Sequence, residues 1–365
     1  MKYYIIAGEA SGDLHGANLI KQLHRKDDKA QIKCWGGDLM QAAGAELVKH
    51  YRDLAFMGFV EVLANLRTIF KNISFCKQDI LAFRPDVLVL IDYPGFNMRI
   101  AKWAHIQGIK VVYYISPQIW AWKQNRVFAL KRDVDRMLCI LPFEVDFYNK
   151  FGYDVDFVGH PLLDAIAQRS EPTPIAGVPA DKPLIALLPG SRTQEINTML
   201  PVMLEAAKSF PEYNFVIAGA PSRDPDFYAP FLNGKNVFFA ANQTYNLLQQ
   251  AHAALVTSGT ATLETALFNV PEVVCYKGNA ISYLIAKRLV KIKYISLVNL
   301  VMDRELVKEL IQNEFNAKNV KKELAAILEK GRYQLIKEGY QELRNKLGGT
   351  GASAIAAGFI INEVA

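Results

Sequence analysis

The chain has 365 residues, more than a single hydrophobic core usually supports, so its length favours two domains. Hydrophobic residues make up 51% and charged residues 21%, an ordinary globular composition that excludes long disordered regions. Lys and Arg exceed Asp and Glu by 42 to 36, a surplus that suits anionic ligands or an anionic membrane surface and is too small to indicate a nucleic-acid-binding protein.

The cysteines indicate a reducing compartment, and the two ends of the sequence bear on secretion and membrane contact. No metal-ligand spacing relates the cysteines, so we predict buried free thiols at Cys34, Cys76, Cys139 and Cys275. The sequence begins with a strand-like segment and not with the charged and apolar regions of a secretion signal, so we expect no secretion. The apolar tail at 352–361 is shorter than the ~18 residues of a membrane-spanning helix, so any membrane contact is expected to be peripheral.

Short β-rich runs alternate with helix-period segments, a pattern typical of parallel sheets with crossover helices. Strands of a first sheet are expected at 2–7, 87–91, 110–115 and 136–140, and strands of a second at 184–188, 214–218, 236–239, 253–256 and 273–276. The proline-rich segment 170–179 shows neither the helical nor the strand periodicity of apolar residues, and we interpret it as a linker. We therefore predict an α/β protein with two doubly wound domains, 1–165 and 166–349, and a tail, 350–365, with ligands bound in a cleft at the carboxyl ends of the strands.

The first strand leads into the segment 8–13, Gly-Glu-Ala-Ser-Gly-Asp, which opens a helix. Small residues let backbone N–H groups approach a ligand, and the helix N-terminus favours an anion. The alternative is a tight turn in which Ser11 or Asp13 caps the helix.

A carboxylate follows the apolar strand 87–91. Asp92 begins the segment Asp-Tyr-Pro-Gly-Phe-Asn, at the position where a general base facing the cleft would lie. A capping or purely structural aspartate is the alternative.

Two more segments end strands of the first sheet. The segment 116–122 carries two tryptophans and a glutamine and could form a partly polar wall for an acceptor, with buried packing as the equal alternative. His160 closes the first domain, where we favour a satisfied turn histidine over a residue lining the site.

Two loops of the second domain suit phosphate. Arg192 ends the segment Pro-Gly-Ser-Arg, which leads from a strand into a helix beginning near Glu195, and its guanidinium can bind a diphosphate through two parallel hydrogen bonds. The segment 257–264 also leads from a strand into a helix whose N–H groups and hydroxyls suit a leaving diphosphate. A surface salt bridge of Arg192 and a helix merely capped by Ser258 are the alternatives.

No metal site is evident, because the Asp-x-Asp pairs Asp133/Asp135, Asp154/Asp156 and Asp224/Asp226 do not follow long apolar strands. We expect Arg192 and a helix N-terminus to stabilise the charge that a divalent ion would otherwise stabilise.

The segment 61–84 has the pattern of a basic amphipathic helix. Apolar residues at Leu63, Leu66, Phe70, Ile73, Cys76 and Ile80 alternate with Arg67, Lys71, Lys77 and Arg84. It could lie on an anionic membrane or pack on the sheet as an ordinary helix. A second basic and apolar stretch, 286–293, could also touch lipid.

In their order and number, these segments resemble one family: lipid-A-disaccharide synthase, the glycosyltransferase that joins two acylated glucosamines in Gram-negative lipid A assembly. The resemblance runs over nearly the whole chain and includes residues 7–13, 57–63, 92–97, 116–122, 141–144, 158–161, 189–192, 258–264, 294–300 and 305–312.

The resemblance implies a GT-B fold whose first domain serves the acceptor and faces the membrane and whose second domain binds the nucleotide sugar. The implied reaction takes UDP-2,3-diacylglucosamine and 2,3-diacylglucosamine 1-phosphate (lipid X) to a β-1,6-linked disaccharide 1-phosphate and UDP, without metal or cofactor. The resemblance also implies that the tail packs back on the first domain. It implies a cytoplasmic enzyme that is peripheral to the inner membrane. A homodimer is possible.

The candidate site follows from both lines of reasoning. Asp92 is the expected catalytic base, and Glu9 and Asp13 are further acids. The expected nucleotide and diphosphate ligands are Arg192, Ser191, Glu195, Ser258, Gly259, Thr260, Thr262 and Glu264, with Asn299, Glu305 and Gln312 implied by the resemblance alone. The expected acceptor ligands are Ser11, Gly12, Asn97, Ser116, Gln118, Trp120 and His160.

The chain departs from the family at Gly95, where many relatives carry a second acidic residue. Asp92 then acts alone, or Glu9 or Asp13 contributes. The alternative functions are a UDP-sugar epimerase of the same architecture and a nucleotide-sugar sensor without catalysis. The basic apolar stretch favours the transferase, because an epimerase needs no surface for acyl chains.

Overall fold

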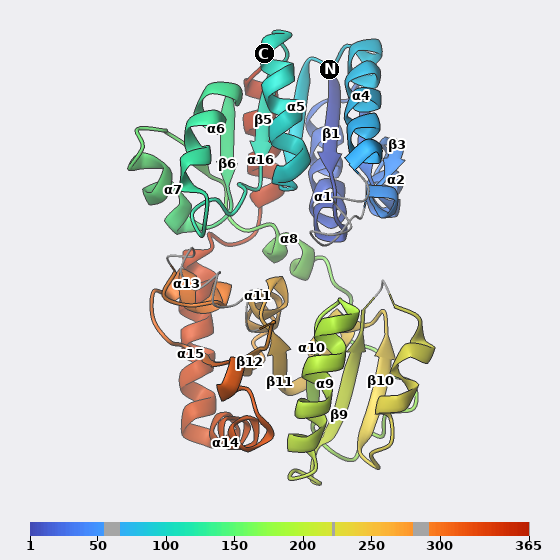
Figure 1. Cartoon of the computed structure of the whole chain (residues 1–365), viewed down its shortest axis with the longest axis vertical. Coiled ribbons are helices and arrows are strands. Elements are labelled where there is room, and N and C mark those ends of the chain that lie inside the picture. Colours follow the sequence, from blue (N-terminus) through green and yellow to red (C-terminus); the bar gives the residue numbers. More distant parts are fainter. Residues whose placement is uncertain (55–65, 221–222, 280–291, 365) are drawn as a thin grey trace. The chain divides into compact units, whose positions relative to one another are not determined.

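The computed structural model describes residues 1–54, 66–220, 223–279 and 292–364. The chain forms two compact units, one of residues 1–168 with 347–365 and the other of residues 169–346. Each unit is a parallel sheet with helices packed on it, which confirms the predicted α/β class (Figure 1).

The first sheet has seven strands in the order β3-β2-β1-β4-β5-β6-β7, all paired in parallel. The strands are β1 (Lys2–Ala7), β2 (Gln31–Gly36), β3 (Glu46–His50), β4 (Val87–Ile91), β5 (Lys110–Tyr114), β6 (Arg136–Cys139) and β7 (Asp156–Phe157). The continuous apolar runs of β1 and β4 are almost wholly buried because both faces of a parallel sheet are covered. β2, β3 and β7 were not predicted.

Described helices of the first unit lie between these strands in the chain, and α8 follows the last of them. They are α1 (Ala10–Lys26), α2 (Asp38–Ala42), α4 (Leu66–Phe83), α5 (Pro94–Ile106), α6 (Val127–Asp133), α7 (Pro142–Asn149) and α8 (Leu162–Ala167), with short 3₁₀ turns η1 (Tyr51–Leu54) and η2 (Gln124–Arg126). α5 begins with Pro94, whose missing N–H and fixed φ suit the first turn of a helix.

The C-terminal helix belongs to the first unit. α16 (Ala352–Asn362) packs against α1. Its N-terminus is capped by Asp164, whose two carboxylate oxygens accept from the backbone N–H of Gly351 at 2.5 Å and of Ser353 at 2.8 Å. At its other end, Glu363 accepts from Nε of Arg136 at 2.8 Å. Charge-assisted hydrogen bonds thus fasten both ends of α16 to the first sheet and its helices.

The second sheet has six parallel strands in the order β10-β9-β8-β11-β12-β13. The strands are β8 (Leu184–Leu188), β9 (Asn214–Gly219), β10 (Val237–Ala241), β11 (Ala251–Thr257), β12 (Glu272–Tyr276) and β13 (Lys308–Ile311). The described helices are α9 (Thr193–Ala207), α10 (Thr244–Gln250), α11 (Thr260–Leu267), α13 (Leu297–Met302), α14 (Ala317–Leu328) and α15 (Lys330–Lys346), with 3₁₀ turns η3 (Pro225–Phe231) and η4 (Gln312–Glu314). Of the six strands, only β13 was not predicted.

Each sheet reverses its strand order at one point, between β1 and β4 in the first and between β8 and β11 in the second. Ligands of open α/β sheets bind where the strand order reverses, outside the carboxyl ends of the strands. The last residues of β1 and β4, Ala7 and Ile91, are direct partners, and Leu188 pairs with Val256 in the second sheet. The chain segments that follow these residues are therefore neighbours within each unit.

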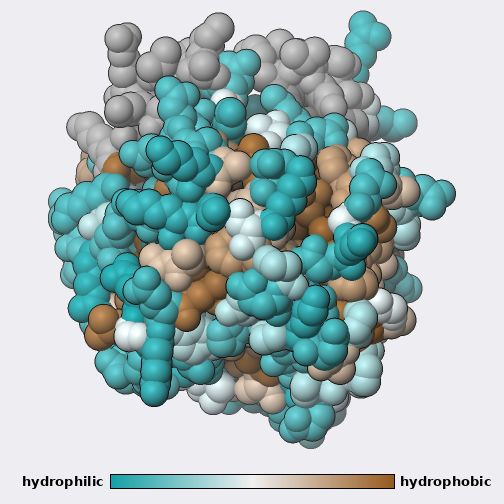
Figure 2. Space-filling view, turned by 90° about the horizontal axis from the view of Figure 1, so that it is seen from below, coloured by the Kyte–Doolittle hydropathy of each residue, from teal (hydrophilic) through white to brown (hydrophobic). Residues whose placement is uncertain are grey.

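The surface seen in Figure 2 is mainly hydrophilic, with hydrophobic residues in smaller areas between the hydrophilic ones. Of the described helices, none is long and apolar enough to cross a membrane. All four cysteines are buried free thiols, as predicted. The predicted basic stretches fall partly outside the described residues, at 61–65 and 286–291.

Candidate functional site

Asp92 is the first residue after β4, and its backbone is strained. Asp92 and Tyr93 have φ angles of +43° and +48°, in the left-handed region that costs a residue other than glycine about 1 to 3 kcal/mol. The side-chain amide of Asn97 donates to the carbonyl of Asp92 at 2.8 Å and to that of Ile91 at 3.2 Å. The hydroxyl of Tyr113 donates to the carbonyl of Asp92 at 2.5 Å. Such strain, held by several buried bonds, is typical of functional sites.

The environment of Asp92 suits a proton acceptor. Burial, followed by the negative charge of Glu9, raises the pKa of the Asp92 carboxyl to about 7, while a backbone hydrogen bond with Tyr93 acts in the opposite direction. A general base is most effective when its pKa lies near the working pH. Asp92 therefore lies directly after β4, as expected from the sequence, and its raised pKa is compatible with the role of general base.

Glu9 and Asp13 lie in different surroundings. Glu9 is exposed at the start of α1, next to the carboxyl edge of the sheet. Asp13 is 3% exposed, and its carboxylate accepts from the N–H groups of Gly37 at 2.8 Å, Met40 at 3.0 Å and Leu39 at 3.2 Å. Asp13 thus caps the N-terminus of α2, a structural task that differs from the expected further acid.

The small residues of the first loop allow close packing. Gly12 is buried against Ala7, and a Cβ on Gly12 would lie 3.0 Å from the Cβ of Ala7. Ser11 is exposed beside it. Asn97, expected to bind the acceptor, is completely buried, and its amide nitrogen is used on backbone carbonyls. Asn97 therefore shapes the Asp92 loop through its amide nitrogen, while its buried Oδ1 has no hydrogen-bond partner among the described residues.

Most of the segment 116–120 is buried in the first unit. Ser116 is 3% exposed and shares a hydrogen bond of 2.7 Å with the hydroxyl of Tyr148. Trp120 is 7% exposed, and its indole N–H donates to Glu144 at 3.2 Å. Ser116 and Trp120 therefore follow the buried alternative, which differs from the expected acceptor wall. Gln118 is exposed.

His160 is a buried turn histidine, as the sequence favoured. It is 3% exposed, and its Nδ1 accepts from the backbone N–H of Leu162 at 3.2 Å. Burial, followed by the nearby His15, lowers the pKa of His160 to about 3, so the imidazole is neutral at ordinary pH. This position differs from direct acceptor binding.

The second unit holds a cavity of about 470 Å³ where the strand order reverses. Its walls come from the segments that follow β8 and β11, and residues 189–192, 257–261, Glu195 and Glu264 line it. Most of the residues predicted to bind nucleotide and diphosphate in this unit therefore lie together.

Arg192 lies at the start of α9 and is held by Glu195. Its guanidinium donates to Oε1 of Glu195 at 3.1 Å, and the backbone N–H groups of Ser191 and Arg192 donate to Oε2 at 3.3 Å each. The Arg192 side chain is 64% exposed, so this ion pair contributes little to stability and can exchange for a ligand anion at small cost. The salt bridge that the sequence offered as the alternative is present, and Arg192 also lines the cavity.

At the start of α11, some polar side chains make internal hydrogen bonds and other residues are exposed. Thr262 is fully buried, and its hydroxyl donates to the carbonyl of Gly259 at 2.8 Å. Glu264 accepts from the hydroxyl of Tyr245 at 2.6 Å, and burial raises the pKa of its carboxyl. Gly259 and Thr260 are exposed at the helix N-terminus, which favours an anion. Thr262 therefore supports the helix from inside.

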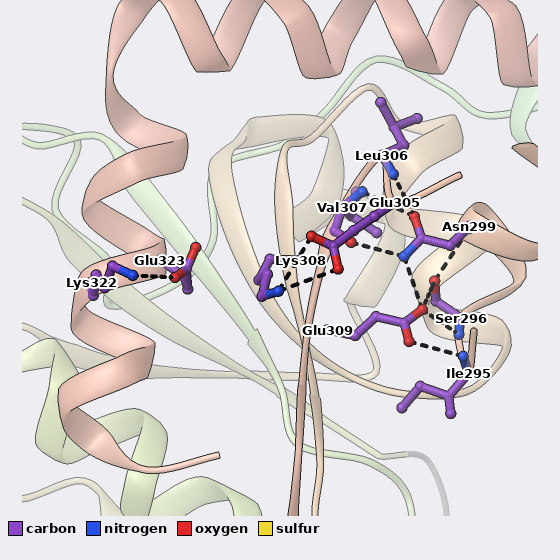
Figure 3. Close-up of polar contacts among 10 residues, drawn as sticks. All are labelled: Ile295, Ser296, Asn299, Glu305, Leu306, Val307, Lys308, Glu309, Lys322 and Glu323. Carbon is purple, nitrogen blue, oxygen red and sulfur yellow. Dashed lines mark hydrogen bonds and ion pairs between the residues drawn. The ribbon is translucent and has the colours of Figure 1, made fainter. Parts of the chain in front are cut away.

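The three residues implied by the resemblance alone differ in role. Asn299 is fully buried, and its amide donates to the carbonyl of Val307 and to Glu309 and accepts from the N–H of Leu306 and of Val307, at 2.8 to 3.0 Å (Figure 3). This complete internal use differs from the implied contact with nucleotide. Glu305 is exposed and pairs with Lys308 at 3.3 Å.

Gln312 is the member of this motif with an unused group. It directly follows β13 and has φ +54°. Its amide nitrogen is buried and has no hydrogen-bond partner in the part of the chain that the structure describes. A buried polar atom without a partner is a natural contact for a ligand at the carboxyl edge of the sheet.

Two residues that matter to the site were missed by sequence reasoning. Tyr93 packs against Gly8, and Glu309 holds the segment around Asn299. The available signals were a bulky residue directly after the candidate base and a glutamate inside an otherwise apolar motif, Leu-Val-Lys-Glu-Leu-Ile.

Among the residues that the structure describes, no three or more His, Cys, Asp or Glu side chains form a group that could hold a metal ion. The Asp-x-Asp pairs have structural bonds instead. For example, Asp133 pairs with Arg132 at 2.7 Å, and Asp156 pairs with Arg136 at 2.9 Å.

This chain is similar in sequence to lipid-A-disaccharide synthases. The family profile described as lipid-A-disaccharide synthetase matches residues 3–359. A lipid-A-disaccharide synthase of Geobacter metallireducens is 41% identical over 367 residues, which cover 98% of this chain and 96% of the relative. A lipid-A-disaccharide synthase of Syntrophus aciditrophicus is also 41% identical, with 97% of this chain and 95% of the relative covered.

Solved structures with a similar fold are more distant in sequence. The complex of S. aureus MnaA with UDP has a TM-score of 0.72 at 13% identity and covers 100% of this chain and 95% of its own. The glycotransferase of kitacinnamycin has a TM-score of 0.69 at 15% identity and covers 100% and 99%. At such identities the likeness shows the fold alone, and it confirms the predicted GT-B fold.

Proposed function

This chain belongs to the lipid-A-disaccharide synthase family and is a glycosyltransferase, and we propose that it transfers a sugar from UDP-2,3-diacylglucosamine to 2,3-diacylglucosamine 1-phosphate (lipid X). The products are the β-1,6-linked lipid A disaccharide 1-phosphate and UDP. The observation that carries the proposal is Asp92, a residue with a strained backbone directly after β4, whose carboxyl has a pKa raised to about 7.

In this mechanism Asp92 acts as the general base. Its carboxylate removes the proton from the acceptor 6-hydroxyl while that oxygen attacks the anomeric carbon of the donor. The bond between the anomeric carbon and the β-phosphate oxygen breaks, and its electron pair leaves with UDP, which inverts the configuration. Gly95 lies where many relatives carry an acid, and exposed Glu9 is the nearby acid that raises the pKa of Asp92 and could assist it.

The second domain receives the leaving group. Arg192 offers a guanidinium that is already turned toward the cavity loop by Glu195. The exposed N-terminus of α11, at Gly259 and Thr260, adds the partial positive charge of a helix end. Together these groups stabilise the negative charge that develops on the diphosphate, and the proposal therefore needs no divalent ion or other cofactor.

The substrates carry acyl chains, so the proposal includes a peripheral contact with anionic lipid on the cytoplasmic face of the inner membrane. α4 supports it: Phe70 is 57% and Leu81 is 49% exposed, while Ile73, Cys76 and Ile80 are buried. One face of this helix packs on the sheet, and another presents apolar and basic side chains to the outside.

The decisive experiment measures UDP release by the purified protein from UDP-2,3-diacylglucosamine, with and without lipid X, and identifies the products by mass spectrometry. We expect UDP release that depends on the acceptor, together with a disaccharide phosphate, at the same rate when a chelator is present. Conversion of the donor without acceptor would instead indicate an epimerase, and binding without any product would indicate a sensor. A chelator effect reversed by magnesium would overturn the metal-free mechanism.

A further inference from the structure

A buried carboxylate in the second domain, Glu309, holds the chain segment around Asn299. Glu309 in β13 is 7% exposed. Its Oε2 accepts from the N–H of Ile295 at 2.9 Å, and its Oε1 accepts from the N–H of Ser296 at 3.0 Å, the Ser296 hydroxyl at 2.8 Å and the Asn299 amide at 2.9 Å (Figure 3). A carboxylate is rarely buried unless its oxygens are satisfied in this way.

The segment that Glu309 holds reaches the nucleotide cavity. The N–H of Ile295 donates to Glu309, and the carbonyl of the same residue accepts from the hydroxyl of Ser258 at 3.0 Å. Ser258 lines the cavity of about 470 Å³ that also contains Arg192. A single backbone residue therefore links the buried carboxylate to a hydroxyl at the site.

This link decides what Ser258 can offer a ligand. A hydroxyl has one proton to donate and two lone pairs to accept with. Because the proton of Ser258 is used on Ile295, the oxygen presents lone pairs to the cavity. Ser258 is thereby directed to accept a hydrogen bond from a donor group of the ligand, such as a hydroxyl or an N–H, and not to donate to the diphosphate.

A second buried carboxyl nearby shows that the arrangement around Glu309 is selective. Glu309 pairs with Val274 in the sheet, so Glu272, two residues earlier on β12, lies on the same face. Glu272 is fully buried, and neither of its oxygens has a hydrogen-bond partner among the residues that the structure describes. Burial, followed by the negative charge of Glu309, raises its pKa well above the usual value. The hydrogen-bond donors are thus gathered on the carboxyl that connects to the cavity.

We propose that Glu309 is a positioning residue for donor binding, which fixes Ile295 so that the Ile295 carbonyl orients the Ser258 hydroxyl in the nucleotide cavity. The inference rests on the proposed function, because it assumes that this cavity takes the UDP part of the donor. If Glu309 were purely structural, replacing it would change only the stability of the protein. If Glu309 is a positioning residue, replacing it also changes UDP affinity, and this change acts through Ser258.

The test is a double-mutant cycle on UDP binding to the full chain, measured by calorimetry at a temperature where all variants are folded. Glu309→Gln places an amide opposite the N–H of Ile295 and should weaken UDP binding by about tenfold, as should Ser258→Ala. The double variant should bind UDP no more weakly than the weaker single variant, because both changes break one chain of contacts. In turnover assays Glu309→Gln should raise the donor KM with little change in kcat, since UDP is held in both the ground and the transition state.

Glu323→Gln is the matched control. It removes the same charge from a partly buried glutamate of α14, which pairs with Lys322 away from this network (Figure 3). It should leave UDP affinity unchanged.

Unchanged UDP affinity in folded Glu309→Gln, or additive losses in the double variant, would overturn the proposal. If Glu309→Gln does not fold, Ser296→Ala replaces it in the same cycle, because it removes one donor to Oε1, and the same two outcomes then decide. Failure of the wild-type protein to bind UDP would refute the proposed function first and this inference with it. Wild-type UDP binding with an unaffected Glu309 variant would refute the inference alone.

Discussion

The ring of Tyr93 lies directly over Gly8: a Cβ on Gly8 would come within 2.3 Å of the ring. The two residues follow the central strands β1 and β4, and the contact leaves room for no side chain at position 8. Tyr93 is the residue after Asp92 and shares its left-handed backbone. The absence of a side chain at Gly8 therefore helps to fix the loop that carries the proposed base.

Gly8→Ala should consequently impair catalysis. The added methyl group must displace the Tyr93 ring and shift Asp92, so we expect kcat/KM to fall by about tenfold or more and the free energy of unfolding to fall by about 1 to 3 kcal/mol. Gly95→Ala is the control, since a Cβ at Gly95 would have no atom within 4 Å among the described residues, apart from its chain neighbours and the nearby backbone of its own helix. Equal activity of the Gly8 and Gly95 variants would contradict a role for the Tyr93 contact.

Asp92→Asn tests the general base. We expect folding and UDP affinity to be retained and kcat to fall by ~10² to 10⁴-fold. Because only the ionised carboxylate accepts the proton, wild-type kcat/KM should rise with pH and level off above about pH 7, the pKa to which burial and Glu9 raise Asp92. Near-normal turnover of the variant, or a wild-type profile without a transition near neutral pH, would reject this role.

The same raised pKa predicts how the stability of this variant depends on pH. The pKa of Asp92 is raised from 3.8 to about 7 on folding, so the ionised form is disfavoured in the folded state. The charge therefore lowers stability fully above about pH 7, and the effect disappears only well below the unfolded-state pKa, at about pH 3, where the carboxyl is mostly protonated in both states. Thermal unfolding should show Asp92→Asn with a higher Tm than the wild type at pH 8, and the difference should shrink as the pH falls toward about pH 3.

The sequence was a good guide to the sheet centres and a poor guide to what surrounds them. β1, β4, β8 and β11 are apolar runs, and the residues after them, including Asp92 and Arg192, could be placed at the carboxyl edges from the pattern alone. β2 and β13 were missed because charged residues interrupt their apolar pattern, as Lys308 and Glu309 do in β13. Pairing with neighbouring strands decides such cases, and local sequence does not record it.

The internal roles of polar residues could not be predicted for a related reason. Asp13 caps a helix that begins 25 residues later in the chain, and Asn299 satisfies backbone groups of the turn that leads to β13. A polar residue in a functional motif has the same sequence signal whether it meets a ligand or a buried backbone group. Only the hydrogen-bond partners distinguish the two.

Arg192→Ala should weaken UDP binding by about 10 to 100-fold and slow turnover, because a charge-assisted contact with the leaving diphosphate is lost. Arg192→Lys should recover only part of the affinity, since an ammonium cannot form two parallel hydrogen bonds. Arg304→Ala is the control in the same domain, as Arg304 is exposed and pairs with Glu342. Calorimetric titration with UDP measures all three, and unchanged affinity of Arg192→Ala would place the diphosphate elsewhere.

The last prediction concerns the proposed membrane contact of α4. Phe70 is 57% exposed beside the exposed Lys71, and each basic residue near an anionic surface contributes about 1 kcal/mol to binding. Phe70→Glu with Lys71→Glu should therefore reduce cosedimentation with anionic vesicles and activity on long-chain substrates, while UDP binding stays unchanged. Because both side chains face outward, the Tm should fall little, whereas a packed helix face would lose much of its stability. Leu335→Glu with Arg332→Glu makes the same change in charge on exposed residues of α15 and should leave vesicle binding intact. Full vesicle binding by the folded Phe70 and Lys71 variant would show that this surface is not the membrane contact.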